Sequence, residues 1–131
     1  MAIRIKVFGE EHERTAEGYR QLGVTQYEMH GYNSALQSHQ RALAIRIKVF
    51  GEEHERAADS YRQLGLTQYE MHDYPSALQS HQHALAICIK VFGEEHENTA
   101  YSYRELGVTQ YEMHDYPSAL QSHQRALAIR M

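Results

Sequence analysis

The chain has 131 residues, of which 42% are hydrophobic and 23% charged, and its formal net charge is −4. This composition excludes a disordered, collagen-like or disulfide-rich chain and is typical of one small globular unit. There is no apolar stretch near the roughly 18 residues that span a bilayer, no secretory signal, and no run of Lys and Arg that would neutralise nucleic-acid phosphates. We therefore expect neither a membrane nor a nucleic acid as partner. The single Cys88 cannot form an internal disulfide, which favours a reducing, cytoplasmic location.

A period of 42 residues explains why so short a chain holds ten Tyr and ten His. Phe8, Phe50 and Phe92 stand 42 residues apart, and a Gly follows each of them. Residues 9–50 differ from 51–92 at only eight positions, one of which exchanges Arg46 for Cys88. Such self-similarity is typical of stacked helical or strand units. The sequence predicts a single array over 1–131, made of a remnant of a preceding second helix (1–8), repeat 1 (9–50), repeat 2 (51–92) and a truncated repeat 3 (93–131).

Each repeat begins with a predicted amphipathic helix. In the first copy this helix runs from about Arg14 to His30, and its apolar and small residues recur at steps of three and four. A break follows at His30-Gly31-Tyr32-Asn33. In the later copies Pro75 and Pro117 stand after this break, where proline suits the first position of a second helix.

The second predicted helix carries Leu36, Leu43 and Phe50 on one stripe. We expect it to end at Gly51, because glycine most easily adopts a left-handed C-terminal cap. The linker Gly-Glu-Glu-His then leads into the next repeat, whose acidic first turn suits the positive N-terminus of a helix.

Three glycines, Gly23, Gly65 and Gly107, fall inside the predicted first helices. Glycine costs about 1 kcal/mol relative to alanine at such a position. Their repetition predicts helix backbones that approach closely, and such packing leaves little room for an enclosed active site.

The residues Tyr19-x-x-Leu22-Gly23, Tyr32-x-x-Ala35 and His39-x-x-Ala42-Leu43 recur at the same spacing in all three copies. This pattern resembles the tetratricopeptide repeat. The 42-residue period, the Ala-Leu-x-Ile run and the Gly-x-x-His linker are similar to repeats of kinesin light chains and nephrocystin-3-like proteins. Two Asn of the kinesin light chain pattern are Arg and Gln or Glu here, and Glu replaces the Pro after the linker His, so the resemblance does not extend to kinesin cargo specificity.

The resemblance implies an all-α, right-handed α-α superhelical solenoid of antiparallel helix hairpins. It also implies a non-enzymatic scaffold whose first helices line a concave groove that binds an extended peptide or a partner helix of another protein. The family's groove positions fall on Glu17, Arg20, Val24, Tyr27 and Glu28; on Asp59, Arg62, Leu66, Tyr69 and Glu70; and on Tyr101, Arg104, Val108, Tyr111 and Glu112.

The rows of Arg and Tyr among these positions suit a peptide ladder, because Arg offers a fork of donors and Tyr a large contact area at small entropy cost. The alternative interpretation is that Arg20 pairs with Glu17 or Glu28 along a solvated helix face.

Histidines form columns at equivalent positions of the repeats, which raises the question of a metal site. Equivalent residues of packed helices lie about 10 Å apart, whereas zinc ligands lie about 2 Å from one ion, so we expect no metal and no cofactor. The His39 column is expected to hold a packed interhelical ring with a hydrogen bond, and buried His that become charged near pH 6 would destabilise the stack. Ser38 and His39 are neighbours on a helix and point apart, so they do not predict a catalytic pair.

A second hypothesis is that the array is a structural, self-assembling module, whether natural, excised or engineered. Both ends of the sequence read as unfinished helices, and we expect apolar surface at Leu120, Leu127 and Ile129 to be exposed. With nearly identical repeats, chains could stack end to end or exchange hairpins, which would give a homo-oligomer.

Overall fold

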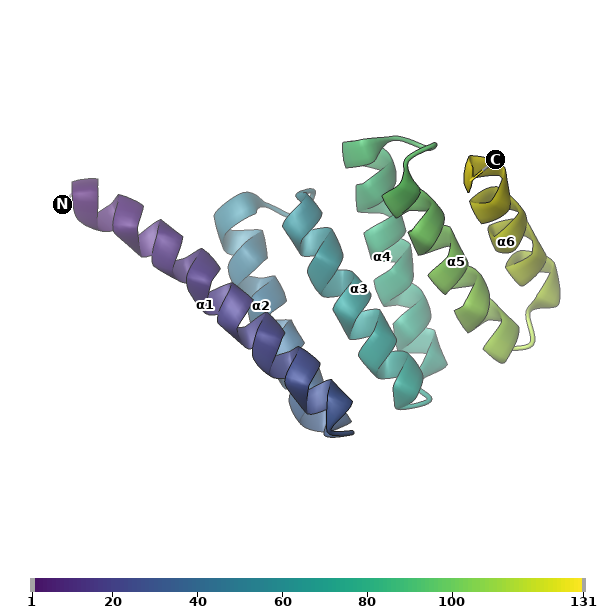
Figure 1. Ribbon diagram of the computed structural model, residues 1–131, viewed down its shortest axis with the longest axis horizontal. Helices are drawn as coiled ribbons and strands as arrows, with labels where there is room; N and C mark the ends of the chain where they lie inside the picture. Colours follow the sequence, from purple (N-terminus) through teal and green to yellow (C-terminus); the bar gives the residue numbers. More distant parts are fainter. Residues whose placement is uncertain (1, 131) are drawn as a thin grey trace.

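Three antiparallel helix hairpins make up the part of the chain that the computed structural model describes, residues 2–130, with side chains for residues 12–129. The helices are α1 (Ala2–Glu28), α2 (Tyr32–Phe50), α3 (Glu55–Glu70), α4 (Tyr74–Phe92), α5 (Glu97–Glu112) and α6 (Tyr116–Arg130). The described residues contain no strand. Successive hairpins stack side by side, with α1, α3 and α5 in front of α2 and α4 in the view of Figure 1. The prediction of an all-α solenoid is confirmed. None of these helices has the length and hydropathy of a membrane span.

The bend inside each hairpin is closed by a histidine with a positive φ. The φ angles of His30, His72 and His114 are 65°, 62° and 65°, a region that costs an L-residue about 1–2 kcal/mol. In the first bend the N–H of Gly31 donates to the carbonyl of Gln26 at 2.8 Å, as in a helix-ending motif of the Schellman type. Each of these histidines also makes a ring hydrogen bond through Nδ1 to a tyrosine hydroxyl two residues later, at 2.8–2.9 Å. This bond helps to offset the backbone strain.

The linkers between hairpins depend on glycine and histidine together. Gly51 ends α2 at φ 95° and ψ 165°, a region open essentially to glycine alone, rather than in the left-handed cap that the sequence predicted. His54 then caps α3, because its ring Nδ1 accepts from the N–H of Arg56 at 3.1 Å while the ring stacks on Phe50 at 4.4 Å. The linker at 93–96 repeats this arrangement.

The first copy of the linker sequence adopts a different structure. Residues 8–12, 50–54 and 92–96 are all Phe-Gly-Glu-Glu-His, yet α1 continues through the first of them without a turn. The segment predicted as a remnant of an earlier helix therefore merges with the helix expected from about Arg14; Met1 lies outside the described residues. Glu is a good helix former and one Gly costs about 1 kcal/mol, so these five residues permit both structures.

The interior is built from small residues that surround histidine rings. His39 and His81 are almost fully buried in the second helices, whereas their equivalent His123 is exposed. A Cβ added at Gly23 would lie 2.7 Å from the ring of His39, and one at Gly65 would lie 2.6 Å from that of His81. The glycines thus make room for rings and not for a neighbouring backbone, which corrects that prediction. The predicted hydrogen bond is also wrong for His39, since neither of its ring nitrogens has a partner.

Replacing Gly65 with Ala is expected to lower the free energy of unfolding by about 1–3 kcal/mol, because the new methyl group displaces the buried His81 ring. The matched control is Gly18→Ala in α1, where a Cβ meets no atom within 4 Å. This control should gain up to about 1 kcal/mol from helix propensity. Urea denaturation of both variants checks the pair, and a Gly65→Ala variant as stable as the parent would contradict the packing described.

Candidate functional site

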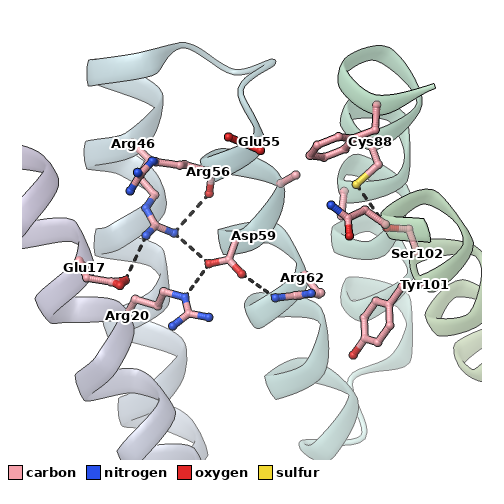
Figure 2. Close-up of a pocket in the computed structure, with 14 residues that line it drawn as sticks. Glu17, Arg20, Arg46, Glu55, Arg56, Asp59, Arg62, Cys88, Tyr101 and Ser102 are labelled. Carbon is pink, nitrogen blue, oxygen red and sulfur yellow. Dashed lines mark hydrogen bonds and ion pairs between the residues drawn. The ribbon is translucent and has the colours of Figure 1, made fainter. Parts of the chain in front are cut away.

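An open pocket of about 620 Å³ lies between the hairpins and draws residues from α1 to α5 (Figure 2). Its lining consists of Glu17, Arg20, Arg46, Glu55, Arg56, Ala58, Asp59, Arg62, Ala84, Cys88, Phe92, Asn98, Tyr101 and Ser102. Figure 2 shows the charged groups of α1, α2 and α3 on one side and Cys88, Tyr101 and Ser102 on the other. One wall of the pocket is therefore ionic, and the other is thiol, aromatic and hydroxyl in character.

Asp59 is the centre of the ionic wall. Its Oδ2 accepts from Nε of Arg20 at 2.6 Å and from Nη1 of Arg46 at 3.1 Å, and its Oδ1 accepts from Nη2 of Arg62 at 2.7 Å. Burial alone would raise the pKa of this carboxyl, but the hydrogen bond and charge of Arg20, then the other arginines, hold that pKa below its ordinary value. The bond to Asp59 in turn raises the pKa of Arg20. The carboxylate thus stays charged and fixes three guanidinium groups from three helices.

Arg46 on α2 is the most deeply buried of these cations, with 3% of its side chain exposed. Besides Asp59, its Nη1 donates to the hydroxyl of Ser60 at 3.0 Å and to the carbonyl of Arg56 at 3.3 Å. Longer ion pairs run from its guanidinium to Glu13 at 3.4 Å and Glu17 at 3.5 Å. Several acceptors therefore compensate the desolvated charge, as a buried cation requires. The groove positions derived from the first helices could not include this residue, because it lies on a second helix.

The corresponding joint, meaning the contact between the second helix of repeat 2 and the first helix of repeat 3, has no such ion pair. Cys88 replaces Arg46 and Tyr101 replaces Asp59, and the hydroxyl of Ser102 donates to the Cys88 sulfur at 3.6 Å. Burial raises the pKa of the Cys88 thiol, so it remains neutral at neutral pH. Arg62 lies over the ring of Tyr101 with its guanidinium carbon 5.3 Å from the centroid. The two joints are thus alternative solutions, one ionic and one neutral, at equivalent positions.

All fifteen predicted groove residues lie on α1, α3 and α5, but only some of them meet in the pocket. The five that line it are Glu17, Arg20, Asp59, Arg62 and Tyr101. Of the others, Val24, Tyr27, Leu66, Tyr69 and Val108 are half-buried, and Glu28, Glu70, Arg104, Tyr111 and Glu112 are exposed. Arg20 uses one donor on Asp59 of the next repeat, so the arginine row is linked between repeats.

The tyrosine row is also linked from one repeat to the next. The hydroxyl of Tyr69 donates to Glu112 at 3.2 Å. Burial, together with Glu70, raises the pKa of Tyr27 to about 12. Tyr111 occupies the same position in repeat 3 and is exposed. Tyrosine hydroxyls of one repeat thus approach carboxylates of the next along α1, α3 and α5.

Metal ligation and nucleophile activation each require particular side chains to meet. No three His, Cys, Asp or Glu side chains of the described residues come together as metal ligands would. Ser38 donates to Gln26 at 2.7 Å and not to His39, so the adjacent pair lacks the contact that activates a nucleophile. The contacts made by the side chains that line the pocket include hydrogen bonds, ion pairs and a cation–aromatic contact.

Comparisons with known proteins support the fold. The family model described as "Tetratricopeptide repeat" matches residues 1–48, 28–89 and 69–131. The comparison with curated protein sequences found no match. Among solved structures, BtubC (BKLC) from P. vanneervenii is similar with a TM-score of 0.86 at 23% identity, and the match covers 98% of this chain and 52% of BtubC. The TPR domain of Arabidopsis FLU is similar with a TM-score of 0.79 at 17% identity, over 89% of this chain and 95% of that domain. The chain thus spans about half the length of BtubC.

Proposed function

The chain belongs to the tetratricopeptide repeat family, whose repeats are generally protein-interaction modules, and on that premise we propose that its α1, α3 and α5 groove binds an extended peptide or a partner helix. The observation that carries the proposal is the open pocket of about 620 Å³ between hairpins, lined by residues of α1, α3 and α5 as well as by α2 and α4. Its position on the predicted groove face supports binding there.

The pocket supplies two kinds of contact to such a ligand. Asp59 holds Arg20 and Arg62 in fixed orientations, and each guanidinium keeps further N–H groups for ligand carbonyls or carboxylates. Preorganised donors lower the entropy cost of binding. Phe92 and the ring of Tyr101 offer apolar contact area to a ligand side chain. Because four arginines and three carboxylates line the pocket, its charges nearly balance, and recognition rests on local hydrogen bonds and contact area.

The proposed role is that of a non-enzymatic scaffold without a cofactor. The single free thiol of Cys88 supports a reducing, cytoplasmic setting. The absence of a basic run in the sequence supports a protein partner over a nucleic acid.

Two tyrosines of α5 give a matched test of the groove. Tyr101 lines the pocket and lies beneath Arg62, whereas Tyr103 lies beneath Arg125 and does not line it. Peptides captured from an array by the parent chain should bind Tyr101→Ala about fivefold more weakly or worse, for a loss of about 1 kcal/mol or more. Tyr103→Ala should retain parent affinity. Equal losses in both variants, or none in Tyr101→Ala, would place the binding site elsewhere.

A further inference from the structure

The face of α6 that points away from α5 exposes large apolar side chains. Leu120 and Leu127 are 59% and 61% exposed, as the sequence predicted, while Ile129 is half-buried. The equivalent leucines of the preceding second helices are all half-buried, and they are Leu36, Leu43, Leu78 and Leu85. The difference arises because α3 packs on α2 and α5 packs on α4. What covers this face in the first two repeats is therefore a first helix of the next repeat.

The same chain carries an uncovered first helix. Leu22 of α1 is 47% exposed, whereas its equivalents Leu64 in α3 and Leu106 in α5 are 6% and 7% exposed. The helices of those two leucines also pack against the second helix of the preceding repeat, α2 for α3 and α4 for α5. The described residues contain no helix on this side of α1 (Figure 1). The uncovered faces of α1 and α6 are thus the two halves of one repeat-to-repeat interface.

The polar groups at the two faces are also complementary. Between repeats 1 and 2, Arg20 pairs with Asp59 across 39 residues. In repeat 3 the residue equivalent to Arg20 is Arg104, which is exposed. In a following copy the residue equivalent to Asp59 would be Glu17. Glu17 keeps 40% of its side chain exposed although it pairs with Arg46. Opposite charges would therefore meet at the position where the internal interface has an ion pair.

A second polar contact follows the tyrosine row. Tyr69 donates to Glu112 across 43 residues. The residue equivalent to Tyr69 in repeat 3 is Tyr111, and the residue equivalent to Glu112 in a following copy would be Glu28; both are exposed. Polar and apolar groups thus specify the same relative position of the two copies.

We propose that copies of this chain associate head to tail, with α5 and α6 of one copy packed against α1 of the next as α3 and α4 pack against α5. The partner is a second copy, because α1 is the helix type that covers equivalent faces within the chain. The interface is heterologous, so each copy keeps one free face and the assembly can continue. The layer of α1, α3 and α5, and with it the groove, then runs on from copy to copy.

Sedimentation equilibrium from micromolar to millimolar protein tests this arrangement with one lysine on each face. The parent chain should rise above 15.2 kDa with concentration. Leu22→Lys and Leu127→Lys should each weaken association about tenfold or more, because each places a charge where apolar area is buried. Both sites are exposed in the monomer, so circular dichroism and melting should be unchanged. Val91→Lys on α4, at another exposed apolar residue, should associate like the parent.

A mixture of the two lysine variants separates head-to-tail packing from other assemblies. Leu22→Lys keeps a competent α6 and Leu127→Lys keeps a competent α1, so the mixture should form a pair of twice 15.2 kDa and nothing larger. A two-fold α6–α6 pair would leave Leu22→Lys dimeric, and hairpin exchange would leave both variants dimeric. Either result, or a parent chain that stays at 15.2 kDa throughout, would overturn the proposal.

Discussion

Asp59→Tyr is expected to lower the free energy of unfolding by about 2–4 kcal/mol, and adding Arg46→Cys to the same chain is expected to recover most of that loss. Without the Asp59 carboxylate, the buried guanidinium of Arg46 loses its acceptor at 3.1 Å and keeps mainly neutral or distant partners. Breaking a buried pair from one side is strongly destabilising, because a desolvated charge remains. The double variant instead copies the neutral combination of Cys88 and Tyr101 found at the next joint.

Urea denaturation of the parent, both single variants and the double variant forms a complete double-mutant cycle. The two substitutions should be coupled by at least about 1 kcal/mol in the favourable direction. The control cycle is Cys88→Arg with Tyr101→Asp, which should transfer the ionic joint to repeats 2 and 3 with coupling of the same sign. Additive effects in the first cycle would show that Arg46 and Asp59 do not act as a pair.

The second large effect is a loss of stability in mild acid that arises from two histidines. Burial lowers the pKa of His39 to about 4; the charge of Asp59 opposes this shift, and the charges of Arg20 and Arg46 add to it. Burial, with a smaller contribution from the charge of Arg62, lowers the pKa of His81 to about 4. Above pH 6.5, the ordinary value, neither the native nor the unfolded chain holds these protons. Between pH 6.5 and about 4 the unfolded chain binds more protons, so stability falls as pH falls, by about 1.4 kcal/mol per pH unit per histidine.

Urea midpoints of the parent and of His39→Phe with His81→Phe should be compared between pH 7.5 and 4.5. Burial raises the pKa of Glu105, which opposes the trend because protonation then favours the native state. The difference between parent and variant cancels this contribution and isolates the histidines. The double variant should lose most of the acid sensitivity, while His123→Phe, at the exposed equivalent, should keep it. Parallel pH profiles for the parent and the double variant would contradict the burial of neutral rings.

Sequence periodicity predicts much of this fold because the information is local and is repeated three times. The hairpins, the prolines at the start of α4 and α6, and the exposed leucines of α6 all follow from residue type and spacing. The turn at residues 50–54 does not follow in the same way, since the same five residues at 8–12 are helical. The local sequence therefore does not by itself decide between a turn and a helix at these five residues.

The candidate site is less predictable because its main contacts join different repeats. An arginine on a helix is usually solvent-exposed, so nothing local to Arg46 predicts a buried centre of hydrogen bonds. The available signal is the paired change from Arg46 and Asp59 to Cys88 and Tyr101 in a chain that otherwise repeats closely. Glycine patterns likewise indicate close approach but not the atom that approaches, which proves to be a histidine ring.

Amide chemical-shift mapping tests most directly whether the α1, α3 and α5 face is where a partner binds. A peptide selected on an array would be titrated into the isotope-labelled chain. Binding in the groove predicts shifts that concentrate near Arg20, Arg62 and Tyr101 and continue along the tyrosine row towards Tyr69. Shifts confined to residues of α2, α4 and α6 outside the pocket lining would contradict it.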